Sequence, residues 1–233
     1  MKRAVRASLL AALLLAAGCA KDDTVLYGEY AMGTVSGRSI ISDGGLTYDV
    51  AEQQCPGLLD TMKRVLFRCD ILRRTGNDRY DIRLREMQSV LCKDPIEAAS
   101  MDGDAVGDDP VRAISIWSGN GYLNFLIGIA VLNGSDTRHF INLVHDGASP
   151  SADTLYFSLR HNAYGEYFGA EGTEDAYFEL GRSYVSFPVG RFIPEGRESM
   201  PVRIFWRWHA EENGRPKKET DTFSAAGEIR RGR

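Results

Sequence analysis

After its first 18 residues the sequence contains no apolar stretch long enough to span a bilayer as a helix. It also lacks a CxxC pair, a Cys/His spacing typical of zinc sites, and the GxSxG motif of many serine hydrolases. Basic residues are outnumbered, with 28 Lys and Arg against 32 Asp and Glu. A nucleic-acid partner is therefore not expected, because such partners need a basic surface. We expect no metal or other cofactor.

The N-terminus carries the organisation of a secretory signal. Three basic residues precede the short apolar run Leu9–Leu15, and small residues then lead to Cys19. A cysteine directly after such a cleavage site supplies the thiol that accepts a diacylglycerol. We predict that residues 1–18 are a lipoprotein signal peptide and that a lipid on Cys19 attaches the mature chain to the outer membrane. Cleavage changes the formal charge from −4 to −7, because it removes three basic residues and no acidic one.

Residues 19–24 are expected to form a short tether behind the lipid. Within it, Lys21, Asp22 and Asp23 resemble the acidic export signal of Bacteroidetes lipoproteins, which implies transport to the outer face of the outer membrane. The alternative is a polar spacer that holds the folded part away from the periplasmic membrane face. The two interpretations predict a surface-exposed and a periplasmic protein, respectively.

Two-residue periodicity and turn signals dominate the mature chain, which predicts an all-β protein. Five strands are expected within the first domain, residues 25–97. They are Leu26–Ser36, Arg38–Ser42, Leu46–Val50, Met62–Leu72 and Arg79–Leu91. In the last of these, Ile82 and Leu84 alternate with charged residues, as in a half-buried strand. Asp43–Gly45 predicts a hairpin turn.

Residues 98–110 are rich in Asp and Gly, which predicts a solvated linker. The spaced aspartates suggest calcium, but the glutamate and flanking helices of an EF-hand are not visible. Residues 111–224 then predict an antiparallel β-sandwich, and residues 225–233 a basic flexible tail. The sandwich strands are expected at Ile114–Trp117, Tyr122–Leu132, Arg138–Val144, Thr154–His161, Tyr184–Pro188 and Val202–Ala210. The predicted core face of the last strand consists of Val202, Ile204, Trp206 and Trp208.

Three cysteines follow Cys19, at Cys55, Cys69 and Cys92. Because their number is odd, at most one pair can form. Cys69 and Cys92 lie on predicted strands of one domain and are the expected pair if a disulfide forms. Burial of both as free thiols is the alternative.

Several short segments of the second half carry a family resemblance. They are Ile116-Trp117 with Gly121–Phe125, His139–Val144, and Leu159–Gly165. Their order and spacing resemble the C-terminal sandwich domain of the NigD-like lipoproteins of Bacteroidetes, and the strands before them are similar to that family's N-terminal OB-like barrel. The resemblance implies an all-β chain, with an N-terminal OB-like barrel followed by a C-terminal antiparallel β-sandwich. It implies no catalytic residues, because the family takes its name from a bacteriocin-production locus and is otherwise largely uncharacterised.

The first candidate binding group is Arg160, His161 and Asn162 at a predicted strand end. Such side chains can form a hydrogen-bonding array for a polar ligand. They also close off sheets by bonding to loop carbonyls, which is the interpretation we favour. His139 and Asn142 belong to the same family segments, but periodicity places them on opposite faces of their strand.

The second candidate is the insert Glu166–Arg182, together with Tyr164 just before it. Its aromatic and acidic residues, Tyr167 among them, are of the kind that binds sugars, since rings stack on a pyranose and carboxylates accept from its hydroxyls. A solvated loop is the alternative. Glycoside hydrolysis would need two carboxylates at a suitable distance, and a Ser/His/Asp site would need a base. The candidates for that base are His139, His145, His161 and His209.

The expected function is therefore non-enzymatic. We expect an accessory binding or assembly module of the cell envelope, for a glycan, a peptide or an envelope protein. The alternative is a bacteriocin-related immunity or accessory protein, with an acidic face complementary to a cationic peptide. An envelope hydrolase comes third, since it would need catalytic groups that converge in one cleft.

Overall fold

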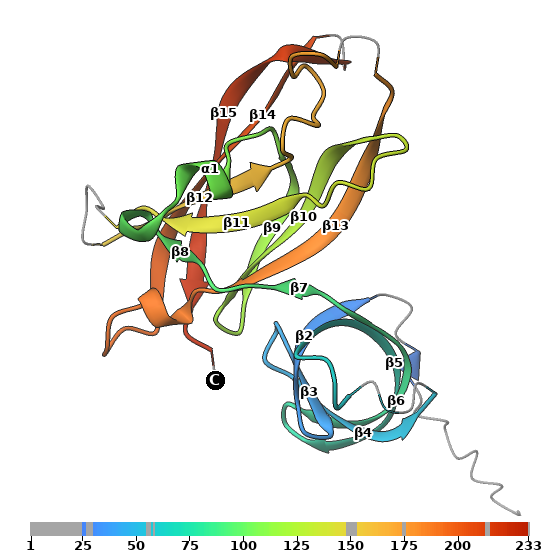
Figure 1. The fold of residues 1–233 in the computed structure, drawn as a ribbon. Helices are drawn as coiled ribbons and strands as arrows, with labels where there is room; N and C mark the ends of the chain where they lie inside the picture. Colours follow the sequence, from blue (N-terminus) through green and yellow to red (C-terminus); the bar gives the residue numbers. More distant parts are fainter. Residues whose placement is uncertain are drawn as a thin grey trace, which may run out of the picture.

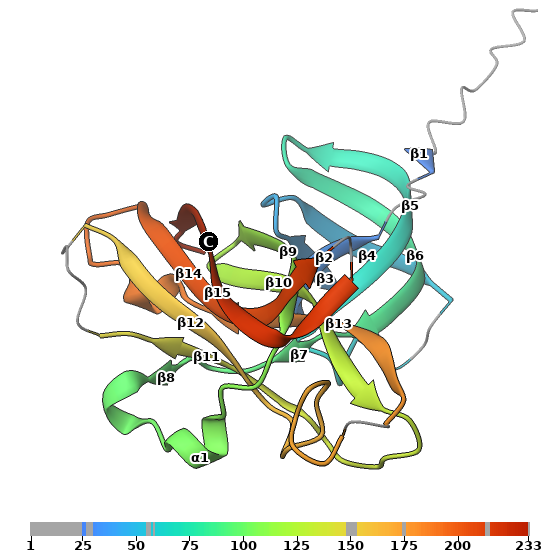
Figure 2. The ribbon, with the colours of Figure 1, turned by 90° about the horizontal axis from the view of Figure 1, so that it is seen from above.

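The computed structural model describes residues 25–26, 30–54, 57, 59–147, 153–173, 176–212 and 215–232. In this part the chain forms two β domains that lie side by side (Figures 1 and 2). The all-β prediction is confirmed. No helix of the described ranges has the length and apolar character needed to cross a membrane. The predicted lipidation and export residues, Cys19 and Lys21–Asp23, lie outside the described residues, as does Cys55.

The first domain is a closed barrel, seen nearly end-on in Figure 1. Its strands are β1 (Val25–Leu26), β2 (Ala31–Ser36), β3 (Ser39–Ser42), β4 (Thr47–Gln53), β5 (Arg64–Gly76) and β6 (Arg79–Ser89). They pair in the order β1-β5-β2-β3-β4-β6, and β6 pairs back onto β5. The parallel pair β4–β6 completes a closed five-strand barrel, as predicted for an OB-like domain.

Alternation along the strands fills the barrel. Ile82 and Leu84 of β6 are fully buried, as predicted, and they pack with Val65 and Phe67 of β5. The intervening charged side chains lie outside and form cross-strand ion pairs, such as Arg83 with Glu52. The barrel core therefore follows directly from the two-residue pattern.

The second domain is a sandwich of two sheets. Its strands are β7 (Leu91–Cys92), β8 (Ile96–Glu97), β9 (Arg112–Gly119), β10 (Tyr122–Leu132), β11 (Phe140–His145), β12 (Leu155–Asn162), β13 (Phe178–Pro188), β14 (Ser199–Glu212) and β15 (Arg215–Arg230). One sheet has the order β7-β13-β10-β9 and the other β15-β14-β12-β11-β8. The predicted sandwich is confirmed, with three parallel pairings (β7–β13, β8–β11 and β12–β14) among antiparallel ones.

The predicted core face of β14 is found between the sheets. Val202 and Ile204 belong to the core, and Trp206 packs partly buried against it. Trp208 is also buried, but it lies outside this cluster and lines a pocket with Phe168 and Phe178. The neighbouring His209 is also buried, although the alternation places it on the outer face. The strand register shifts between His209 and Glu211, which breaks the two-residue pattern at that point.

Residues 98–110 are part of the sandwich rather than a solvated linker. They contain a 3₁₀ turn (Ala98–Ser100) and the short helix α1 (Gly103–Val106), whose Val106 is buried. The chain crosses between the domains earlier, around Val90, because β6 ends at Ser89 and β7 pairs with β13. The Asp/Gly composition resembles a linker, but the buried side chain of Asn162 holds the backbone carbonyls of this segment.

The C-terminal prediction also needs correction. Residues 225–230 are not a flexible tail, because β15 continues to Arg230, which pairs with Ser199 of β14. The strand is polar and largely exposed at the edge of its sheet, so its composition resembles that of a tail.

The possible disulfide does not form between the two described cysteines, and the alternative of free thiols holds. Cys69 is a buried free thiol in the barrel, and Cys92 is an exposed free thiol on β7 of the sandwich. The two residues do not share a domain, as was expected, because the chain crosses to the sandwich between them. Burial raises the pKa of the Cys69 thiol to about 11, so this cysteine stays protonated.

Candidate functional site

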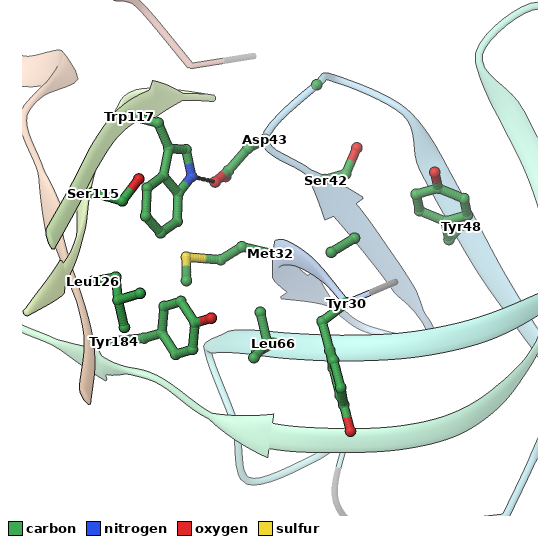
Figure 3. A pocket seen from close by; sticks show the side chains of 12 residues that line it. Tyr30, Met32, Ser42, Asp43, Tyr48, Leu66, Ser115, Trp117, Leu126 and Tyr184 are labelled. Carbon is green, nitrogen blue, oxygen red and sulfur yellow. Dashed lines mark hydrogen bonds between the residues drawn. The ribbon is translucent and has the colours of Figure 1, made fainter. Parts of the chain in front are cut away.

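The two domains enclose a solvent-open pocket of about 460 Å³ where they meet (Figure 3). The barrel contributes Tyr30, Ala31, Met32, Ser42, Asp43, Gly44, Tyr48 and Leu66. The sandwich contributes Ser115 and Trp117 from β9, Leu126 from β10 and Tyr184 from β13. Its volume lies within the range of small-molecule and side-chain binding sites.

The inner wall of the pocket is apolar and aromatic. Met32 and Leu66 are buried there, with Trp117 and Tyr184 packed against them (Figure 3). The two aromatic rings meet edge to face, with centroids 6.3 Å apart and planes at 78°. This geometry is favourable for aromatic pairs and fixes the orientation of both rings.

A buried arginine holds the pocket together from the barrel side. The Arg64 side chain is 0% exposed, and its Nη2 donates to Asp43 Oδ1 at 2.5 Å. The same guanidinium donates to Ser186 Oγ at 3.0 Å and to Asn124 Oδ1 at 2.9 Å, both on the sandwich. It also lies over the ring of Tyr122, 4.2 Å from the centroid. Arg64 thus connects one domain to the other.

Asp43 makes the reciprocal contacts. Its Oδ2 accepts from Trp117 Nε1 at 3.1 Å and from Asn124 Nδ2 at 3.0 Å. Burial raises the pKa of Asp43 above its ordinary value, and the attraction of Arg64 and these hydrogen bonds offset part of that rise. Gly119 allows the close approach, since a Cβ at that position would overlap the side chain of Asp43. The pocket wall is therefore held rigidly by paired polar groups.

The chemistry of the pocket favours binding over catalysis. The Asp43 carboxylate already accepts three hydrogen bonds, and Ser42 Oγ is engaged with the backbone of Leu46. What remains available is an aromatic and aliphatic surface, with the half-exposed Tyr30 and the exposed Ser115 at the rim. Within the described ranges, no group of three or more His, Cys, Asp or Glu side chains could hold a metal ion.

The predicted triplet at the end of β12 lies elsewhere and clamps a loop. Arg160 forms an ion pair with Asp108, and Asn162 Nδ2 donates to the carbonyls of Asp104 and Ala105 at 2.9 and 3.1 Å. His161 is fully buried, and its Nδ1 lies 2.8 Å from the carbonyl oxygen of Pro110. All three side chains are used in tying β12 to residues 104–110.

The protonation of His161 follows from these contacts. Because the Pro110 carbonyl can only accept, Nδ1 of His161 carries the proton and its Nε2 is an acceptor. His139 Nδ1 lies 3.0 Å from that Nε2 and must be the donor. Burial lowers the pKa of His161 to about 4 and also lowers that of His139. The pair is therefore neutral, and it is structural.

Other predicted residues are dispersed. Tyr164 is exposed and contacts Phe140 edge-on, whereas Tyr167 lines a different depression beside Arg207. Asn142 accepts from Lys93 Nζ at 2.6 Å. The histidines lie in three places, with His145 bonded to Glu97, His161 to His139, and His209 near Phe168. The backbone N–H of Tyr164 donates to Asn162 Oδ1 at 2.9 Å, and Tyr167 lines its depression together with Asp108 and Pro110. The rings of the two tyrosines therefore lie beside the loop clamp and do not form one binding array with the triplet.

Sequence reasoning missed Arg64 and assigned Asp43 only to a turn. One feature of the sequence could have found Arg64. Leu66 is apolar, although it lies on the strand face that would be polar if it were exposed, and the structure shows that residues 64–67 are all buried. A strand that is apolar on both faces is covered on both sides. Arg64 lies on the same face as Leu66. Its charge is therefore expected to be buried and to need a partner.

Comparison with known proteins decides the family. The model of the NigD-like C-terminal beta sandwich domain matches residues 94–220, more than half of the chain. The chain belongs to the NigD-like family. The matched range begins after the crossover at Val90 and includes the residues 98–110 that pack on the sandwich. No curated protein matches this NigD-like chain.

Solved structures share its two-domain fold. A protein of unknown function from Bacteroides vulgatus has a TM-score of 0.60 at 20% identity, over 85% of this chain and 90% of that one. A NigD-like immunity protein from Bacteroides caccae has a TM-score of 0.57 at 19% identity, over 84% and 90%. A protein from Bacteroides fragilis that is named as a putative lipoprotein has a TM-score of 0.59 at 13% identity, over 86% of this chain and 96% of that one.

Proposed function

We propose that this NigD-like protein is a non-enzymatic accessory protein of the cell envelope that binds a polypeptide partner at the interdomain pocket. The observation that carries the proposal is an aromatic pocket whose walls are held open by the Arg64–Asp43 network. A preformed pocket costs little to order on binding, so an inserted side chain retains more of its binding free energy.

The character of the walls favours an apolar or aromatic side chain as the inserted group. Met32, Leu66, Leu126 and the rings of Trp117 and Tyr184 offer area for burial. Polar atoms that could bind sugar hydroxyls are mostly engaged within the protein. Anchor side chains of this kind dominate the binding energy of protein interfaces.

The test is site-specific photo-crosslinking in cells. A photo-reactive amino acid at Ser115, exposed at the pocket, should give an adduct with a defined envelope protein, identified by mass spectrometry. The matched control is the same amino acid at Ser224, an exposed serine on β15 outside the pocket. The proposal would be rejected if both positions crosslink to the same proteins, or if Ser115 gives no adduct.

We further propose attachment to the outer membrane through a lipid on Cys19, with export directed by Lys21, Asp22 and Asp23. The experiment is protease shaving of intact cells that carry either the native chain or alanines at those three positions. Surface exposure is supported if the protease removes the native chain from intact cells but not the alanine variant. Protection of both places the protein on the periplasmic face and restricts the partner to that compartment.

A second candidate function is bacteriocin immunity. It is favoured by the similarity to the structure named as a NigD-like immunity protein and by the acidic mature chain, with a formal charge of −7. An acidic protein attracts a cationic peptide at long range. Deletion should then sensitise a bacteriocin-producing strain to its own product, and unchanged self-protection would count against this role.

A further inference from the structure

A second pocket, of about 370 Å³, opens at the end of the sandwich remote from the barrel. It lies where β13 begins and β14 ends, beside the insert that precedes β13 (Figure 1). None of its lining residues belongs to the interdomain pocket, so its occupant would be independent of the polypeptide proposed there.

Aromatic side chains form one side of this pocket. Tyr177 is 67% exposed, the largest exposure among the large hydrophobic residues described. Phe168 stands edge-on to Phe178, with centroids 6.3 Å apart and planes at 84°. Phe168 also stands edge-on to His209, at 5.2 Å and 74°. These contacts orient Phe168 and Phe178, while Tyr177 remains accessible to a ligand.

Polar groups form the other side. The indole Nε1 of Trp208 is buried and has no hydrogen-bond partner among the residues that the structure describes. Burying such a donor without an acceptor costs free energy in the ligand-free protein. At the rim, Arg112 Nη2 lies 3.4 Å from Glu211 Oε1, and Glu179 is exposed. Because Nε1 of Trp208 has almost no accessible surface, the polar groups that the pocket offers to a ligand are a guanidinium and two carboxylates.

His209 adds a neutral group. Its ring is buried beside the backbone of Lys217 and Lys218, and burial lowers its pKa. Arg112 is paired with Glu211, and Glu179 adds a second carboxylate, so the pocket carries no uncompensated arginine charge that would select an anion.

We infer that this pocket binds a neutral sugar ring, as the terminal residue of a glycan. The apolar face of a pyranose would stack on Tyr177, and its hydroxyls would bond to Arg112, Glu211 and Glu179. An acyl chain or a purely aromatic ligand would desolvate the charges of Arg112, Glu179 and Glu211 without replacing their hydrogen bonds.

The experiment uses the lipid-free mature chain and a panel of neutral probes. These are glucose, galactose, mannose, fucose and N-acetylglucosamine, each with the disaccharides that end in it, followed by saturation-transfer NMR and tryptophan fluorescence. At least one probe should bind at millimolar concentration. Tyr177→Ala should weaken its binding at least tenfold, whereas Tyr164→Ala, at an exposed tyrosine outside the pocket, should leave it unchanged.

A second variant separates binding from folding. Glu179→Gln keeps the size of an exposed lining side chain and replaces the charged hydrogen-bond acceptor by a neutral amide. It should leave the thermal stability of the ligand-free chain unchanged, while affinity for the bound probe falls roughly five- to tenfold. Failure of every sugar in the panel to bind, or binding that both variants leave intact, would overturn the inference. Neither result bears on crosslinking from Ser115.

Discussion

The Arg64 guanidinium lies 2.5 Å from the Asp43 carboxylate, and the two side chains are only 0% and 14% exposed. Both residues belong to the barrel, yet their other hydrogen bonds reach Trp117, Asn124 and Ser186 of the sandwich. If the domains separated, the ion pair could persist within the barrel, but both side chains would lose these hydrogen bonds to the sandwich. The ion pair therefore couples the fold of the barrel to its contact with the sandwich.

Replacement of Arg64 should destabilise the protein strongly. Arg64→Ala leaves the Asp43 carboxylate buried without its cation, which typically costs about 3–5 kcal/mol. Urea unfolding of the variant, followed by tryptophan fluorescence, measures the change. The matched control is Arg79→Ala, which breaks the exposed pair with Asp49 and should lower the stability far less. Equal losses in the two variants would contradict the coupling role.

Stability should fall on mild acidification because of His161. Its folded pKa is about 4, whereas an unfolded histidine titrates near 6.5, so between these values only the unfolded chain takes up the proton. Above about pH 6.5 this histidine does not lower the free energy of unfolding. As the pH falls towards 4, the free energy of unfolding decreases by about 3 kcal/mol because of this one group. Urea midpoints across this range should decrease more steeply for the native chain than for His161→Gln. Parallel curves would show that the group does not titrate as argued.

The loop clamp at Asn162 should protect α1. Asn162→Ala removes the donor to two carbonyls, of Asp104 and Ala105, and should cost about 1–3 kcal/mol. Amide exchange at Val106 and Gly107, whose N–H groups bond within α1, should become faster. Arg160→Ala affects only a partly exposed ion pair with the same loop and should change exchange little. Unchanged protection in Asn162→Ala would assign the order of this segment to other contacts.

The two described cysteines should differ in reactivity. Burial raises the pKa of both thiols, that of Cys69 to about 11, but only Cys92 is exposed to a reagent. Brief alkylation of the native protein should therefore modify the peptide that contains Cys92 and spare the one that contains Cys69. Peptide mapping by mass spectrometry provides the measurement, with the urea-unfolded chain as control. A mass corresponding to a Cys69–Cys92 disulfide would contradict the structure.

Much of the fold could be predicted because it depends on neighbours in sequence. The burial of Ile82 and Leu84 and of Val202 and Ile204 follows from alternation within single strands. The prediction of a solvated linker at residues 98–110 was wrong, because the side chain of Asn162 bonds to carbonyls of this segment, more than fifty residues earlier in the chain. Composition shows that a segment is polar, but it does not show which distant side chain satisfies its backbone.

The sequence by itself determined the β pattern and the family resemblance, since both depend on local order and spacing, but it misplaced the boundary between the domains at residues 98–110. Only the tertiary structure decided the sites. It made Asp43, a turn residue, the partner of Arg64, and it brought Tyr177 of the insert to Trp208 of β14. The physical reason is that pockets and buried charges depend on contacts between segments far apart in the chain, and on burial that is set only when the two domains and the two sheets pack.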